Sequence, residues 1–289
     1  MRRIGRSSQL ELEALDRLEL PLIARRSWGL RVWSSLWPPV VAIAMALGAW
    51  QFVVLTGWRP PWVLPGPATV LPRLVEDLLS DDLLLAVGIT LRRAVVGFGL
   101  ALIVGTLLGL AIVRSRLLRA GIASLITGLQ TMPSIAWFPL AILLFGLTEA
   151  AIVFVVVLGA APSVANGLIH GIDNVPRILR RAGHVLGARG FGAYRFVILP
   201  AALPSFVGGM KHAWAFAWRS LMAGELLVII AQRPSLGVRL QFARELSDAE
   251  GLLATMLVVL IIGVAVDLLI FGFLERAIRR RWGLVEDVG

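Results

Sequence analysis

Long apolar runs separated by arginine-rich segments constrain this chain more than any other feature of its sequence. A helix needs about 20 consecutive apolar residues to cross the hydrocarbon core of a bilayer, which is about 30 Å thick. Several runs reach that length, and the mean hydropathy of the 289 residues is +0.83. Backbone groups in lipid must find their hydrogen bonds inside the segment, and the alternating pattern of a transmembrane barrel is absent from the sequence. We therefore predict an all-α polytopic membrane protein.

The apolar runs predict six transmembrane helices. We expect them at about residues 39–55, 94–113, 122–145, 150–169, 204–230 and 252–273. The second contains Gly105 and Gly109, a small-xxx-small spacing that lets two helix backbones approach closely. The third contains Pro133 and Pro139, and the fourth contains Pro162. Because proline frees a backbone carbonyl that neighbours or water must then satisfy, these two spans are candidates for lining a path.

Arginine is distributed unevenly between the segments that join these spans. By the predicted topology, nineteen arginines fall on one side of the membrane and seven on the other. Since an excess of arginine marks the cytosolic side, we expect both termini in the cytosol. The first arginines are not followed by the apolar core of a signal peptide, so we expect the N-terminus to be retained.

The same topology divides the chain into five parts. These are a cytosolic tail at 1–37, the first transmembrane helix at 38–57, an extracytoplasmic loop at 58–93, a transmembrane core at 94–274 and a cytosolic tail at 275–289. We expect a short helix at about Gln9–Leu20 in the first tail and another near Val70–Leu79 in the external loop. The core includes a polar cytosolic loop at 171–203, which is too rich in arginine to cross the membrane.

Composition excludes several classes of function. The net charge of +10 belongs to arginines that flank apolar runs, which indicates topology rather than binding to nucleic acid. There is no cysteine, which rules out disulfides and thiolate metal sites. The sequence has no GxxxxGK[ST] phosphate loop, and its only lysine is Lys211. We predict that the chain does not hydrolyse ATP and holds no cofactor.

The large cytosolic loop has a pattern of its own. Apolar residues recur at helical spacing, and basic residues occupy the other positions. The apolar set is Ile178, Leu179, Ala182, Val185 and Leu186. Gly187 follows and should end the helix, because glycine accepts the positive φ of a C-terminal cap. With a second short helix at about Gly192–Ile198, the loop predicts a rigid bent element at the membrane surface.

Several motifs of the chain are shared with one family of proteins. They are Ala182-Gly183-xxx-Gly187-Ala188, the interval to Ile198, Leu199-Pro200-Ala201-Ala202-Leu203-Pro204, Leu64-Pro65-Gly66-Pro67, Thr90-Leu91-Arg92-Arg93 with Gly97-Phe98, and Pro133 to Leu140 through Phe145-Gly146. Over about residues 60–282 the chain resembles the membrane permeases of binding-protein-dependent ABC importers, which have a MetI-like helical bundle. It is most similar to the permeases for alkanesulfonates, taurine and nitrate.

The resemblance implies a function and a set of partners. The loop would dock in a groove of a separate cytosolic ATPase, which binds ATP and Mg, and would move when that subunit closes. The residues implied in this coupling are Arg181, Ala182, Gly183, Leu186, Gly187, Ala188, Leu199 and Pro200. The further partners would be a second copy of the chain, a second ATPase subunit and an extracytoplasmic substrate-binding protein. The complex would lie in the bacterial plasma or inner membrane.

The loop departs from the family pattern at two positions. Arg181 stands where the family often has glutamate, and Gly183 stands in place of its second alanine. We interpret the first difference as a change in one polar contact with the ATPase, and not as a loss of docking.

Polar residues inside the predicted spans are candidates for the translocation path. They are Gln130, Thr131, Ser134, Arg219 and Glu225. Arg219 and Glu225 are six residues apart, or about 240° around the helix, so they cannot pair with each other. The alternative for each is a structural pair with another helix. For the first three the alternative is ordinary helix contact. For Lys211 and Asp267, nearer the inner surface, we expect snorkelling.

Two other classes of function remain open at this stage. A secondary transporter driven by an ion gradient would use Glu225 or Asp267 as its coupling carboxylate. A membrane-embedded enzyme has weaker support, because His170, His184 and His212 lack metal-ligand spacing.

Overall fold

The computed structural model describes residues 28–230 and 233–281, and its regular elements in those ranges are all helical. The predicted all-α class is confirmed. The described residues divide into two units, of which the first ends at residue 52 and the second begins at residue 53. The predicted helix at Gln9–Leu20 lies outside the described residues.

Helix α2 (Trp28–Leu55) contains every described residue of the first unit and ends three residues into the second. It begins well before the predicted span, although it contains Pro38 and Pro39. Its segment Trp37–Leu55 is long and apolar enough to cross a membrane.

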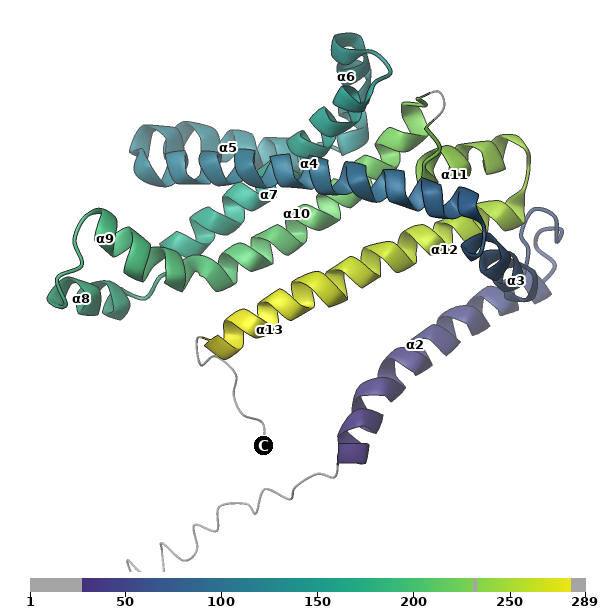
Figure 1. The fold of residues 1–289 in the computed structure, drawn as a ribbon, viewed down its shortest axis with the longest axis horizontal. Helices are drawn as coiled ribbons and strands as arrows, with labels where there is room; N and C mark the ends of the chain where they lie inside the picture. Colours follow the sequence, from purple (N-terminus) through teal and green to yellow (C-terminus); the bar gives the residue numbers. More distant parts are fainter. Residues whose placement is uncertain (1–27, 231–232, 282–289) are drawn as a thin grey trace, which may run out of the picture. The chain divides into compact units, whose positions relative to one another are not determined.

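The second unit contains the remaining helices (Figure 1). They are α3 (Pro67–Leu78), α4 (Asp81–Arg114), α5 (Arg116–Thr131), η1 (Ser134–Trp137), α6 (Phe138–Phe145), α7 (Glu149–Asp173), α8 (Arg177–Val185), α9 (Phe191–Ala193), η2 (Tyr194–Ile198), α10 (Leu199–Leu227), α11 (Leu236–Glu245), α12 (Ala249–Ala265), η3 (Val266–Phe271) and α13 (Gly272–Arg281). Here η1 is a 3-10 helix, and η2 and η3 are π-helical stretches.

Five uninterrupted helical segments of the described residues can span a membrane. The third predicted span, at about 122–145, is broken in the structure. Helix α5 ends at Thr131, and the chain resumes at Ser134 as η1 and α6. Pro133 lies at the break, where it has no N–H to continue the helical hydrogen bonds.

The bounds of two other spans differ from the prediction. Helix α4 begins at Asp81, so part of the predicted loop at 58–93 is helical, and the side chain of Ser80 caps its first turn. The last span continues without a gap through η3 into α13 and ends at Arg281. The short helix predicted near Val70–Leu79 is present as α3.

Helix α7 lies at the centre of the second unit and packs against both α4 and α10. Small residues allow the close approach. A Cβ on Gly105 would lie 2.5 Å from the backbone oxygen of Ala161, which confirms the close packing predicted for this glycine. A Cβ on Gly167 would lie 2.6 Å from Cα of Gly209 on α10. On the same core, the rings of Trp214 and Trp218 stack with centroids 5.7 Å apart.

Candidate functional site: an elbow, a groove and an outer ion network

The elbow, residues 177–198, joins α7 to α10 and consists of α8, α9 and η2. Helix α8 forms where the apolar spacing predicts it, after Pro176. Its apolar side chains nevertheless lie on the surface, and Val185 and Leu186 are each 86% exposed. Phe191 and Phe196 of the same segment are also exposed. Exposed apolar groups gathered on one short polar segment mark a surface that contacts another protein or the membrane.

The elbow bends at Gly187, as predicted. The φ of Gly187 is +86°, a left-handed conformation that costs a residue with a Cβ about 1–2 kcal/mol. The amides of Leu186, Gly187 and Ala188 donate to the carbonyls of Ala182, His184 and Gly183, at 3.0, 3.1 and 2.8 Å. These bonds satisfy the last carbonyls of α8 and fix the direction in which the chain leaves it.

Gly183 holds the two arms of the elbow together. It is buried, and a Cβ at this position would lie 2.7 Å from Cγ2 of Val197 in η2. The side chain of valine is stiff, so it can yield little. The glycine that replaces the family's second alanine therefore lies at the contact between the arms, while Arg181 points to solvent.

Charged side chains fasten the elbow to the bundle. Arg180 donates to the carbonyl oxygen of Ile172, near the end of α7. The guanidinium of Arg119 on α5 donates to both carboxylate oxygens of Asp173, at 3.1 Å each. Beyond the elbow, Leu199 and Pro200 form the start of α10. A displacement of the elbow would therefore act on α5, α7 and α10 together.

A polar groove of about 530 Å³ lies between α5, α7 and α10. It is lined by Gln130, Ser163, Asn166, Gly167, His170, Ser205, Gly208, Gly209, His212 and Phe216. The amide of Gln130 donates to Oγ of Ser163 at 2.9 Å and accepts from Nδ2 of Asn166 at 2.8 Å. Gln130 was expected from the sequence to face the path, whereas Ser163 and Asn166 were missed.

The other two polar candidates of the third span lie elsewhere. Thr131 is exposed, and its hydroxyl donates to the carbonyl of Gly128 on its own helix at 2.8 Å. Ser134 is half-buried beside Gly159, where a Cβ would lie 3.2 Å from Oγ of Ser134 and 2.8 Å from Oγ of Ser220. The two hydroxyls therefore occupy space that only a glycine leaves free.

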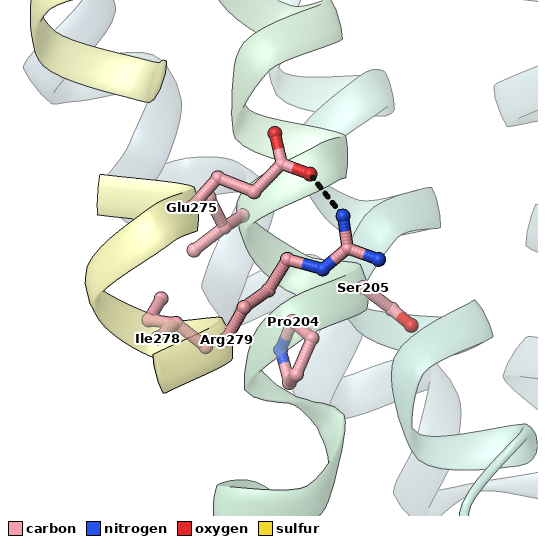
Figure 2. A pocket seen from close by; sticks show the side chains of 6 residues that line it. Pro204, Ser205, Glu275, Ile278 and Arg279 are labelled. Carbon is pink, nitrogen blue, oxygen red and sulfur yellow. Dashed lines mark ion pairs between the residues drawn. The ribbon is translucent and has the colours of Figure 1, made fainter. Parts of the chain in front are cut away.

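A smaller cavity of about 260 Å³ lies where α10 begins and α13 ends (Figure 2). It is lined by Pro204, Ser205, Val207, Glu275, Ile278 and Arg279, with an ion pair of 3.7 Å between Glu275 and Arg279. Ser205 lines this cavity as well as the groove.

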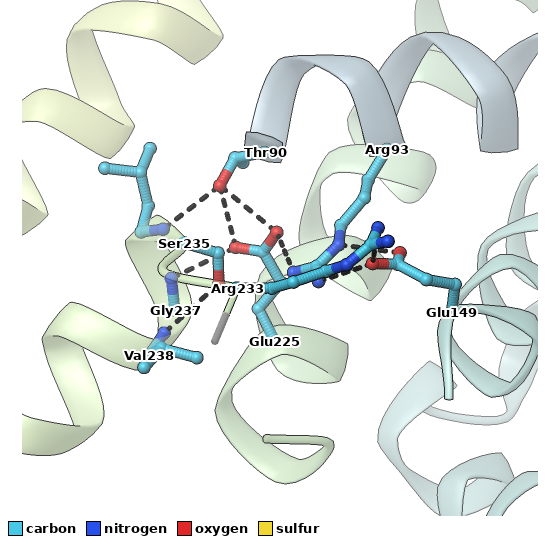
Figure 3. Close-up of polar contacts among 9 residues, drawn as sticks. Thr90, Arg93, Glu149, Glu225, Arg233, Ser235, Gly237 and Val238 are labelled. Carbon is cyan, nitrogen blue, oxygen red and sulfur yellow. Dashed lines mark hydrogen bonds and ion pairs between the residues drawn. The ribbon is translucent and has the colours of Figure 1, made fainter. Parts of the chain in front are cut away.

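At the opposite end of the bundle, buried charges form the outer network (Figure 3). Its centre is Glu225 on α10, whose side chain has no exposed surface. The carboxylate accepts from Oγ1 of Thr90 at 2.9 and 3.1 Å, from Nη1 of Arg93 at 2.9 Å and from the amide of Gly237 at 3.1 Å. Glu225 thus meets another helix, and it does not line the groove in the single chain.

Arg93 extends the network to α7. Its Nε and Nη2 donate to the two oxygens of Glu149, each at 2.8 Å, while Nη1 serves Glu225. Arg233 adds a further pair with Glu149 at 3.3 Å. The hydroxyl of Thr90 also accepts from the amide of Leu236 at 3.0 Å. The outer network therefore ties α4, α7, α10 and α11 together.

The remaining intramembrane charges have different surroundings. Nζ of Lys211 lies 3.1 Å from Oδ2 of Asp267, so these residues pair across α10 and η3, where the sequence suggested separate snorkelling. Arg219 is exposed, and its Nε donates to the carbonyl of Ala215 at 3.1 Å. Within residues 28–230 and 233–281, no cluster of acidic or histidine side chains is suited to a metal ion.

Comparison with known proteins agrees with this architecture. Residues 99–282 match the family described as the binding-protein-dependent transport system inner membrane component. A protein of Brucella melitensis described as an ABC transporter permease is 31% identical over 231 residues, which cover 80% of this chain and 92% of the relative. A protein of Escherichia coli described as an aliphatic sulfonates transport permease is 30% identical, over 84% of this chain and 89% of its own.

A solved structure agrees at the level of the fold. A chain of the MetNI methionine ABC transporter in inward-facing conformations superposes with a TM-score of 0.57 and 21% identity, over 69% of this chain and 99% of its own. The family match at residues 99–282 includes the elbow and the helices that line the groove. The chain therefore belongs to the binding-protein-dependent transport system inner membrane components, the multi-pass permease subunits of ABC importers, whose ATPase activity lies in separate subunits.

Proposed function

We propose that this permease carries a small anion, an organic sulfonate such as taurine or a nitrate-like ion, as a homodimer with two ATPase subunits. The observation that carries the proposal is the elbow. Its helix α8 exposes apolar side chains, is followed by a glycine with positive φ and is packed against the second arm through Gly183. A surface held this rigidly suits the transfer of a displacement from a partner that binds ATP and Mg.

The path of that displacement follows the contacts of the elbow. When the ATPase closes, α8 moves the end of α7 through Arg180, and α7 moves α5 through the pair of Arg119 and Asp173. Helix α10 moves because η2 runs directly into it. These three helices line the groove, so a movement of the elbow opens or closes the groove.

The homodimer is supported by the openness of the groove. In a single chain the polar lining of α5, α7 and α10 lies at the surface of a bundle that must otherwise face lipid. Amides and hydroxyls facing lipid are costly, whereas a second copy would enclose them around a shared aqueous path.

The substrate class is supported by sequence likeness and by charge. The relative described as a sulfonate permease is 30% identical to this chain over 245 residues. No aspartate or glutamate is among the described residues that line the groove, while two histidines are. Such a lining favours an anion over a cation.

Substitution of Gly187 by valine tests the coupling. Valine at a positive φ strains the bend, so we expect ATP hydrolysis to continue while uptake of substrate per ATP falls at least tenfold. The measurement is uptake and hydrolysis by the complete importer in vesicles, with nitrate, taurine and ethanesulfonate as trial substrates. Gly88→Val is the control, because a Cβ there meets nothing within 4 Å. Unchanged coupling in Gly187→Val would overturn the proposal.

The alternative function is secondary transport driven by an ion gradient. It predicts uptake without any ATPase and loss of uptake when an uncoupler is added. The same vesicles prepared without the ATPase subunits separate the two mechanisms.

A further inference from the structure

Arg219 lies within α10 and pairs with no carboxylate among the described residues. It is eight residues from the end of α10 at Leu227, or about 12 Å along the axis at 1.5 Å per residue. Its Nε donates to the carbonyl of Ala215, and its Cζ lies 4.8 Å from the ring centroid of Phe216. Within residues 28–230 and 233–281, no carboxylate oxygen lies within 4.0 Å of it. An arginine at such a depth requires an anion or water.

Among the described residues, three carboxylates of the spanning helices are already paired, whereas the unpaired Asp81, Asp82 and Glu250 lie in the first turns of α4 and α12. Glu225 is enclosed by Thr90, Arg93 and the amide of Gly237, and Glu149 is shared by Arg93 and Arg233. Asp267 pairs with Lys211. A second copy of the chain has the same pairings, so it brings no free carboxylate from these positions. The partner of Arg219 is therefore to be sought outside the protein.

Arg219 continues the row of residues that α10 contributes to the groove. Ser205, Gly208, His212, Phe216 and Arg219 follow one another at spacings of three and four residues, which places them on one face of the helix. Phe216 lines the outer part of this row and carries the guanidinium over its ring. The row of α10 therefore leads from the amides and hydroxyls that line the groove to the guanidinium of Arg219.

We propose that Arg219 binds the oxyanion group of the solute in transit, with the donors of Gln130, Asn166 and His212 along the groove below it. A guanidinium matches two oxygens of a sulfonate or nitrate through parallel hydrogen bonds. This inference rests on the proposed function and narrows it to one residue. A lipid phosphate is the other source of such an oxyanion, and it would require Arg219 to face the bilayer.

The chain has no cysteine, so a single introduced thiol reports local access and charge. Ala215→Cys places a thiol one helical turn from Arg219, on an exposed position. In vesicles holding the complete importer we would measure its rate of reaction with the anionic sulfonatoethyl methanethiosulfonate and the cationic trimethylammonioethyl methanethiosulfonate. Each rate is divided by that of the same reagent with a free thiol in solution. Ile103→Cys, in the exposed apolar part of α4, is the lipid-facing control.

We expect Ala215→Cys to react with both reagents faster than Ile103→Cys and to favour the anionic one. Adding Arg219→Gln should lower the ratio of anionic to cationic rates by about tenfold, because the fixed charge that concentrates anions is gone. Adding Arg92→Gln instead, which removes an exposed arginine of α4, should leave the ratio unchanged. Millimolar taurine or nitrate should slow the anionic reaction only while Arg219 is present.

Three outcomes overturn the inference. One is a ratio that Arg219→Gln leaves unchanged, and another is an equal fall with Arg92→Gln. The third is a thiol that reacts only with the membrane-permeant N-ethylmaleimide, which would place this face of α10 in lipid and assign Arg219 to a phosphate headgroup. None of these outcomes affects the coupling measured with Gly187→Val, so the inference and the proposed function fail separately.

Discussion

At the outer end of the bundle the charged side chains are buried and paired, whereas at the inner end the apolar side chains of the elbow are exposed. Glu225 has no exposed surface and four hydrogen bonds, from Thr90, Arg93 and Gly237. Val185 and Leu186 are 86% exposed. Each end reverses the usual placement of its residue type. The outer network satisfies itself within one chain, while the elbow leaves its apolar area exposed.

The comparison assigns a different kind of sensitivity to each end. Damage to the outer network should act on the stability of the folded chain, because buried charges would lose their partners. Damage to the elbow should act on communication with the ATPase and leave the fold intact, since its side chains are at the surface.

Arg93→Met is expected to have the largest effect. It leaves the buried carboxylate of Glu225 without its charged partner, which costs about 3–5 kcal/mol. The midpoint of thermal unfolding in detergent should fall on the order of 10 °C. The exposed Arg92→Met should change it little.

A double variant sharpens this test. Arg93→Met with Glu225→Leu removes both buried charges, so the chain should recover part of the lost stability. If the double variant is no more stable than Arg93→Met, the outer network is not held by the pairing of these two charges.

Gly183→Ala should have an intermediate effect, and on coupling rather than on folding. The added Cβ would lie 2.7 Å from Cγ2 of Val197 and would push the two arms of the elbow apart. We expect uptake per ATP to fall a few-fold at an unchanged unfolding midpoint. Val197→Ala in the same chain removes the clash and should restore uptake, and a double variant as impaired as Gly183→Ala would separate the glycine from this contact.

The bend at Gly187 could be predicted because its cause is local. A helix with apolar residues at a spacing of three and four, followed by a glycine, specifies its own end, and the φ of +86° agrees. The helical class and the spans follow in the same way from runs of apolar residues. The broken third span was only indicated, because proline marks where a helix is weakened and not whether neighbours support its continuation.

The outer network could not be predicted because its members are far apart in the sequence. Arg93 and Glu225 are 132 positions apart, and Arg93 and Glu149 are 56. Sequence shows that a buried charge needs a partner, but the partner depends on how three helices pack. Similarly, Gln130 and Thr131 are adjacent and polar, but successive residues of a helix point in different directions. Gln130 lines the groove, whereas Thr131 donates to a carbonyl of its own helix.

Arg181→Glu is expected to have a smaller effect, confined to assembly. It restores the acidic residue that the family often has, but the ATPase of this importer meets an arginine. We expect the affinity for that ATPase to fall a few-fold at low salt, as exposed ion pairs contribute about 0.2–1 kcal/mol. The difference should disappear at 1 M salt. Arg177→Glu, elsewhere on α8, controls for net charge, and a loss that persists at high salt would indicate a buried contact instead.

Asp267→Asn should have the smallest effect on uptake. This small effect separates transport driven by ATP from transport driven by an ion gradient. Asp267 and Lys211 are each more than one third exposed, so their pair contributes at most about 1 kcal/mol to stability. If the elbow transmits the movement of the ATPase, uptake driven by ATP should continue at nearly the wild-type rate and remain insensitive to an uncoupler. A transporter that used Asp267 to couple an ion gradient would lose accumulation altogether, because an amide cannot exchange the proton or hold the cation. Lys211→Met is the control, because it removes the ion pair and keeps the carboxylate. A defect seen in Asp267→Asn and absent from Lys211→Met would indicate that an ion gradient, and not ATP hydrolysis, drives uptake.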